Sequence, residues 1–176
     1  MIFVGIDLGL TGAVVALDRD AVPCFVERTP VIRAGGRIIT YDFDLMRDVF
    51  ERLSELGGMA ISMESAIRID RGGHPDTGTT ALRQCRRLWL AALTATRLGA
   101  TVDHVSPARW QAAVLRGLPQ RSTKARSIAY VQRRWPNQID LTPGRCRTPH
   151  HGIADAACLA AYGLALHTLK RQQGGR

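Results

Sequence analysis

The alternation of apolar and polar stretches along the chain predicts strands first and helices afterwards. Short apolar runs rich in strand-forming residues lie at 2–6 (IFVGI) and 13–17 (AVVAL), on either side of the turn-forming LGLTG. A third extended stretch covers 21–28 and follows a polar turn. We expect these three segments to pair in order as antiparallel strands. Residues 29–41 contain a proline and two adjacent glycines, which indicates a connection with room for a short hairpin.

Beyond residue 42 the apolar positions recur at the spacing of helices. The first helix begins at Asp44, ends at Gly57 and has Asp42 or Asp44 as its N-cap. Residues 68–78 (RIDRGGHPDTG) indicate a glycine-rich polar loop. The remaining predicted elements are strands at 59–63 and 101–105 and helices at 79–98, 107–115, 122–134 and 153–170. The order βββαβαβα predicts an α/β fold, with a mixed five-stranded sheet flanked by helices.

The length of 176 residues predicts a single domain, at 1–170, and a basic flexible tail at 171–176. With 45% hydrophobic and 22% charged residues, the chain is too apolar for a disordered protein. Charged residues interrupt the apolar runs before any reaches the ~20 residues of a membrane span, and Asp7 within the first run argues against a signal peptide. We therefore expect a cytoplasmic protein with no membrane partner. Four scattered cysteines without a CxxC pair predict reduced thiols.

Charge is distributed unevenly along the chain. The formal net charge is +9, yet residues 1–60 carry six basic and nine acidic residues, whereas 61–176 carry 18 basic and six acidic ones. A segregated positive field attracts polyanions, and neutralisation of phosphates dominates the affinity of proteins for nucleic acids. The pattern therefore predicts nucleic-acid binding, with a solvated basic surface as the alternative.

Three acidic residues from distant segments are candidates for one catalytic site. Asp7 ends the first predicted strand, Glu64 follows the strand at 59–63, and Asp155 lies near the start of the last helix. We expect the two strands to be neighbours and the alanine-rich helix to bring Asp155 to the same sheet edge. Carboxylates bind hard divalent cations, and two ions about 3.5–4 Å apart support phosphodiester hydrolysis. Asp7 would bridge two Mg²⁺ ions, with Mn²⁺ as the alternative metal, and Glu64 and Asp155 would each hold one.

Two histidines precede the last of these acids. His151 is four residues before Asp155, so in a helix the two side chains share a face. His151 is thus a further candidate catalytic residue, as a general base, a water-binding group or a ligand. Acid–base work is favoured because imidazole binds Mg²⁺ poorly. The structural alternative for His150 and His151 is a pair of exposed loop residues, and that for each acid is a turn former, a strand-end charge or a charge at a helix N-terminus.

Four motifs, taken in order, resemble those of RuvC-type Holliday junction resolvases, especially the short forms of bacteriophages and prophages. GIDLGLTGA at 5–13 is similar to the first-strand motif of the family, and MESA at 63–66 to the segment with its second acid. SPARW at 106–110 resembles a Ser/Thr-Pro-x-x-Trp element, and GIADAACLAAYG at 152–163 resembles the C-terminal acidic helix. The resemblance covers almost the whole chain, and the element order is that of a ribonuclease H-like domain.

The resemblance implies a homodimer that binds four-way or branched DNA and makes paired nicks with Mg²⁺ or Mn²⁺. Position by position, Asp7, Glu64 and Asp155 resemble the catalytic metal ligands, and His151 stands where the family commonly has an acid or a histidine. In a phage or prophage setting, the location would be the cytoplasm of a bacterial host. The positions that resemble DNA contacts are all basic: Arg68, Arg71, Arg83, Arg86, Arg87 and Lys124.

Other functions remain open at this point. A less selective branched-DNA nuclease or a ribonuclease H-type enzyme would use the same acids. Sugar kinases and actin-like ATPases share the Asp-x-Gly of the first strand, but they need a duplicated domain for which 176 residues leave no room. A non-catalytic junction-binding protein would gain nothing from three clustered acids, which destabilise one another without a cation.

Overall fold

The structure is a computed structural model that describes residues 1–65, 78–144 and 146–174. Its main sheet has five strands in the order β3-β2-β1-β6-β7, which confirms the predicted mixed sheet. The bounds of these strands are Ile2–Asp7 (β1), Ala13–Leu17 (β2), Pro23–Arg28 (β3), Met59–Glu64 (β6) and Ala100–Val105 (β7). The β1-β2 and β2-β3 pairs are antiparallel, whereas β1-β6 and β6-β7 are parallel.

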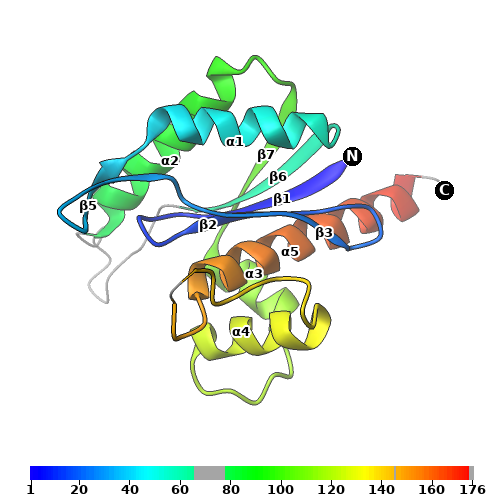
Figure 1. Ribbon diagram of the computed structural model, residues 1–176. Helices are drawn as coiled ribbons and strands as arrows, with labels where there is room; N and C mark the ends of the chain where they lie inside the picture. The colour runs from blue at the N-terminus through cyan, green and yellow to red at the C-terminus, as the bar shows by residue number, and fades with distance from the viewer. Residues whose placement is uncertain (66–77, 145, 175–176) are drawn as a thin grey trace.

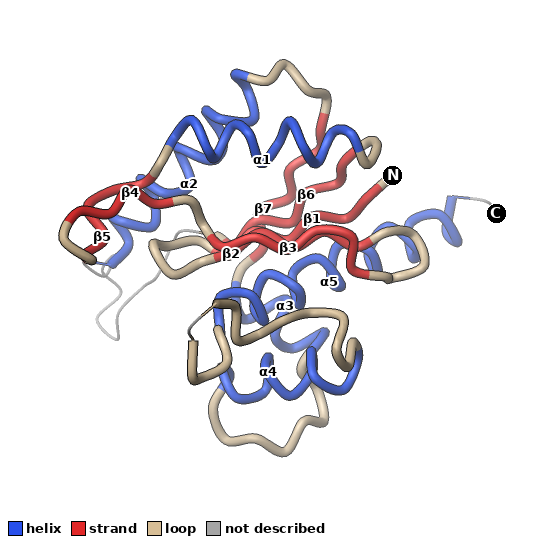
Figure 2. Tube along the Cα trace, in the orientation of Figure 1, coloured by secondary structure: helices blue, strands red, loops and turns tan. Residues whose placement is uncertain are grey.

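Helices cover both faces of this sheet (Figures 1 and 2). One face carries α1 (Phe43–Glu55) and α2 (Gly78–Ala95), and the other carries α3 (Pro107–Val114), α4 (Thr123–Arg134) and α5 (His151–Gly174). Alternate residues of β1 point to opposite faces. Ile2, Val4 and Ile6 therefore belong to the core cluster under α1 and α2, while the neighbouring positions face α5.

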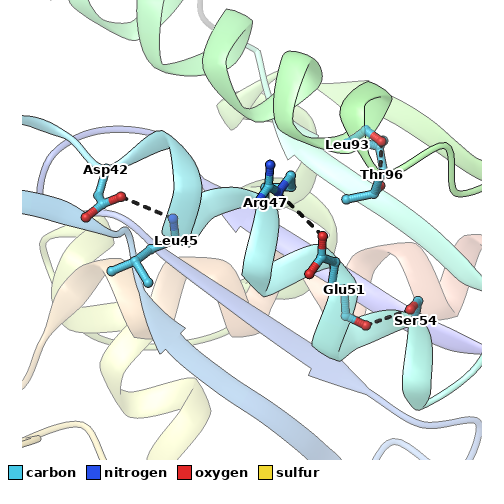
Figure 3. Close-up of polar contacts among 7 residues, drawn as sticks. All are labelled: Asp42, Leu45, Arg47, Glu51, Ser54, Leu93 and Thr96. Carbon is cyan, nitrogen blue, oxygen red and sulfur yellow. Dashed lines mark hydrogen bonds and ion pairs between the residues drawn. The ribbon is translucent and has the colours of Figure 1, made fainter.

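The first helix begins at Phe43, one residue before the predicted start, and one of its two predicted N-caps is confirmed. Asp42 is its N-cap and accepts a hydrogen bond from the Leu45 backbone N–H (3.1 Å), and Figure 3 shows this contact together with the Arg47–Glu51 ion pair. Between β3 and α1, the predicted short hairpin is present as β4 (Val31–Ala34) and β5 (Arg37–Tyr41). These two strands form a separate antiparallel sheet beside the main one (Figure 2).

Very close contact between α5 and β1 holds the centre of the fold together. A Cβ atom at Gly5 would overlap the Ala156 carbonyl oxygen and the Ala160 backbone nitrogen. A Cβ atom at Gly163 of α5 would likewise press against the Ser62 hydroxyl of β6. The small residues at these positions therefore let the helix backbone rest directly on the sheet.

The structure corrects two boundaries of α5. The helix begins at His151 rather than Ile153, and it continues to Gly174, so it includes residues 171–174 that the sequence assigned to the tail. By length and composition only, α5 is also long and apolar enough to cross a membrane. The expectation that no segment of the chain has this property is therefore corrected. Half of that stretch is buried, and residues 156–160 belong to the core under the sheet. The position of α5 is that of a core helix.

Candidate functional site

Asp7 and Glu64 lie at equivalent positions on adjacent parallel strands. The register pairs Gly5 with Ser62 and Ile6 with Met63, so the next residues on the two strands are Asp7 and Glu64. Ser62 faces α5, and Glu64, two residues further along the same strand, shares that face. Asp7 is half-buried, and Glu64 is only 9% exposed. Both carboxylates therefore lie at one sheet edge and on one face.

The first turn of α5 closes over this edge. A Cβ atom at Gly152 would overlap the Thr11 carbonyl oxygen and would stand 3.1 Å from Oδ2 of Asp7. The backbone of the helix start thus lies against both the β1-β2 turn and the Asp7 carboxylate. A helix N-terminus carries a partial positive charge, which stabilises an anion in that position.

Asp155 lies one turn further along α5, between the helix and α4. Burial raises the pKa of its carboxyl, while Ser127, the charge of His151 and the charge of Lys124 act in the opposite direction. Ser127 is fully buried, and its hydroxyl donates to the Thr123 carbonyl (3.2 Å). The α4 helix therefore contributes a cation and a hydroxyl to the surroundings of Asp155, neither of which the spacing of the sequence motifs could reveal.

The Asp155 carboxylate fits a cation. Its Oδ1 atom is buried and has no hydrogen-bond partner within the described part of the chain, although Ser127, His151 and Lys124 act on the carboxylate as a whole. A divalent ion would give this oxygen a partner, and carboxylate oxygens are the ligands that Mg²⁺ and Mn²⁺ prefer. Across residues 1–65, 78–144 and 146–174, no three His, Cys, Asp or Glu side chains lie close enough together to form a metal site. The donor chemistry fits Mg²⁺, but in this structure the three carboxylates are not gathered at the spacing of a metal site.

The two histidines occupy the start of α5 rather than a loop. His150 is its N-cap, because Nδ1 accepts a hydrogen bond from the Ile153 backbone N–H (3.2 Å). An Nδ1 atom that accepts must be unprotonated, and the pKa of His150 is lowered by burial and by the charges of His151 and Arg28. His151 stacks on His150, with ring centroids 6.0 Å apart, and lies close enough to Asp155 to stabilise its charged form.

A buried thiol supports the Asp7 edge from the opposite face of the sheet. Cys85 of α2 accepts a hydrogen bond from the Gly9 backbone N–H (3.3 Å), just after β1, and it also interacts with the Tyr41 hydroxyl. Burial raises the pKa of Cys85, so the thiol stays protonated, and the charge of Asp7 adds to this effect. The residue thereby joins α2, β5 and the turn after Asp7. All four cysteines are free, as the sequence predicts.

Four of the six predicted DNA-contacting residues lie on two helices, α2 and α4. Arg83 and Arg87 are exposed on α2, and Arg86 is half-buried near His104 of β7. Burial lowers the pKa of His104, and the charge of Arg86 lowers it further. Lys124 is exposed on α4 beside Asp155. The remaining predicted contacts, Arg68 and Arg71, lie outside the described residues.

Comparisons with known proteins find solved structures with a similar fold. No protein-family model and no curated protein matches the sequence. Thermus thermophilus RuvC, solved in complex with a Holliday junction substrate, is 14% identical with a TM-score of 0.54, over 96% of this chain and 96% of that chain. The yeast mitochondrial Holliday junction resolvase Ydc2 is 18% identical with a TM-score of 0.53, over 94% of this chain and 78% of that chain. The chain therefore has the ribonuclease H-like α/β fold of RuvC-type resolvases, as its motifs predict.

Proposed function

We propose that this protein is a metal-dependent endonuclease that resolves four-way DNA junctions by paired phosphodiester hydrolysis. The observation that carries the proposal is the position of Asp7 and Glu64 at the same end of adjacent parallel strands, with the first turn of α5 against Asp7. The Oδ1 atom of Asp155 on that helix, which has no hydrogen-bond partner among the described residues, would add a third oxygen donor.

Within this proposal the chain supplies three kinds of group. Asp7, Glu64 and Asp155 would hold the ions, and Mg²⁺, when bound, lowers the pKa of water and stabilises the leaving oxygen of a phosphodiester. His151 is positioned one turn from Asp155 to accept or return a proton. Lys124 offers a positive charge beside the same carboxylate and can hold a DNA phosphate next to it.

The choice of a junction rather than linear DNA rests on the shared fold. Thermus thermophilus RuvC was solved with a Holliday junction substrate, and Ydc2 is a Holliday junction resolvase. We extend that substrate to this chain because its motifs occur in the same order and its basic residues are concentrated in the second part of the chain. Two symmetric nicks require two sites, so the proposal includes a homodimer.

The test compares cleavage with binding in variants of the three acids. Asp7→Asn, Glu64→Gln and Asp155→Asn should each lower nicking of a labelled junction in Mg²⁺ by at least about 100-fold. Each variant should still bind the junction in EDTA. Asp48→Asn, which changes an exposed acid of α1 on the other face of the sheet, is the matched control and should cleave as the wild type does. Full activity in any of the three site variants would refute the assignment of that residue.

A non-catalytic junction-binding protein is the second candidate. Such a protein would use the same basic surface to bind DNA, but it would not need the three acids for catalysis. Junction binding by the wild type without nicking in either Mg²⁺ or Mn²⁺ would favour it.

A further inference from the structure

A basic cleft lies between the β4-β5 hairpin and the start of α5, beside the carboxylate edge. Its volume is about 290 Å³, and its walls include Thr11, Arg28, Thr29, Arg33 and His150. These residues come from the β1-β2 turn, the end of β3, the β3-β4 connection, β4 and the N-cap of α5. Three stretches of the chain that are distant in sequence, around residues 11, 28–33 and 150, thus meet at one small cavity.

The charges around this cleft favour an anion. Arg28 and Arg33 are exposed, and neither forms an ion pair within the described part of the chain. Glu27 also lines the cleft, but its carboxylate already accepts a hydrogen bond from Arg52. The Arg28 guanidinium lies near enough to His150 to disfavour its protonated form. Two guanidinium groups without an ion-pair partner among the described residues therefore line the cleft, and guanidinium groups suit contacts with phosphate oxygens.

A buried hydroxyl in the wall also lacks a partner. Thr29 is only 4% exposed, and its backbone N–H donates to the Gly12 carbonyl (2.9 Å). Its Oγ1 atom has no hydrogen-bond partner among the residues that the structure describes. Buried hydroxyls are nearly always hydrogen-bonded, so an unsatisfied one in the wall of a basic cleft points to a ligand.

The cleft shares a wall with the carboxylate site. Thr11 lines the cleft, and its carbonyl oxygen lies against Gly152 in the first turn of α5. Gly152 in turn lies beside Oδ2 of Asp7. The β1-β2 turn would therefore lie between an anion in the cleft and the Asp7 carboxylate.

We propose that this cleft binds a backbone phosphate of the DNA strand that is cut at the carboxylates. Arg28 and Arg33 would hold the phosphate oxygens, and the Thr29 hydroxyl would donate to one of them after a small movement of the wall. The cleft would then fix the position of the strand along the site. This inference rests on the proposed function. It adds a binding subsite that is separate from α2 and α4, the two helices on which the sequence predicts DNA contacts.

The experiment measures the affinity of the full-length protein for a labelled junction and a linear duplex, in EDTA and over a series of salt concentrations. Arg28→Ala/Arg33→Ala should weaken binding about tenfold or more and lower the slope of log Kd against log salt by about 2. The matched control is Arg19→Ala/Arg171→Ala, which removes the same charge from a cavity at the opposite end of β1. It should leave the slope nearly unchanged.

Thr29→Val gives a second test that charge alone cannot explain. The substitution preserves shape and removes a hydroxyl that has no partner in the free protein, so it should leave the melting temperature unchanged or higher and weaken DNA binding several-fold. Equal losses in the two double variants, or wild-type affinity in Thr29→Val, would overturn the proposal. If Arg28→Ala/Arg33→Ala bound DNA as the wild type does, and inorganic phosphate at constant ionic strength bound only to the wild type, the cleft would be a site for free phosphate instead. If DNA binding depended on the cleft but the protein did not cleave junctions, the cleft would be confirmed as a phosphate site and the proposed nuclease activity would be refuted.

Discussion

At the scale of single residues, the start of α5 holds two ionisable groups whose pKa values depart from those in water. Burial raises the pKa of Asp155, and burial lowers that of His150, whose Nδ1 atom caps the helix. Groups perturbed by burial and by specific charges are concentrated at functional sites. His150 caps the turn that lies against Asp7 and Asp155 lies one turn further along, so their titration bears on stability and on the site together.

We predict that Asp155→Asn stabilises the protein in the absence of divalent ions. The amide keeps the shape of the side chain and removes a charge whose Oδ1 atom lacks a partner in the described residues, which should add about 0.5–2 kcal/mol to the free energy of unfolding at pH 7. Thermal melting in EDTA checks this gain. Mg²⁺ should then raise the melting temperature of the wild type but not of the variant. A less stable variant would contradict this account of Asp155.

We predict that the His150 cap makes stability depend on pH. Because the folded-state pKa is lowered, the contribution of the cap is fully present above the unfolded value of about 6.5 and is lost as pH falls toward the folded value. Asn is a good N-cap that does not titrate, so His150→Asn should show a smaller loss of stability than the wild type between about pH 7.5 and 5.5. Denaturant unfolding at several pH values measures this slope. Parallel pH profiles for the two proteins would count against the cap.

At the scale of elements, the contact between α5 and β1 sets the geometry of the site. The helix backbone rests on Gly5 and carries Gly152 to Asp7, so any increase in the spacing would move the helix start away from the carboxylate edge. Interiors tolerate added volume poorly.

We predict that Gly5→Ala lowers the free energy of unfolding by about 2 kcal/mol or more, because its methyl group would overlap the backbone of α5. Gly58→Ala is the matched control. No atom beyond its chain neighbours lies within 4 Å of an added Cβ there, so little change is expected. Equal stability of the two variants, measured by urea unfolding, would show that the close contact is not limiting.

Much of the element order and part of the site follow from the sequence, for physical reasons. The apolar runs of β1 and β2 are buried on both faces, which makes them easy to recognise, and the adjacent glycines at 35 and 36 supply the positive φ angles that the hairpin turn needs. The start of α5 was misplaced because histidine is an unusual N-cap. Ser127 beside Asp155, and Cys85 beside the turn after Asp7, depend on packing between distant helices, which no local pattern encodes.

At the scale of the whole molecule, exposed cations surround the carboxylate edge, and this arrangement bears on how the proposed acidic site would bind a polyanion. The acids lie at one edge of the sheet, while exposed cations occupy α2, α4 and the cleft beside the hairpin. In the proposed nuclease, these cations would hold the phosphates around the site and leave the acids to bind ions.

We predict that junction binding falls by about 100-fold or more between 50 and 200 mM salt, because several phosphates are neutralised at once. In light scattering the protein should have about twice the chain mass of 19.3 kDa, since paired nicks need two sites. A salt-independent affinity would argue against phosphate contacts, and a monomer both alone and on DNA would argue against paired cleavage.

The most direct test of the central claim is cleavage by the wild-type protein of a labelled four-way junction, beside a matched linear duplex and an RNA/DNA hybrid, in Mg²⁺, Mn²⁺ or EDTA. We expect paired nicks in opposite strands of the junction that require the metal and disappear in Asp7→Asn. Equal cutting of the duplex or the hybrid would identify a general nuclease of the same fold, and cleavage that persists in EDTA or in Asp7→Asn would contradict the carboxylate site.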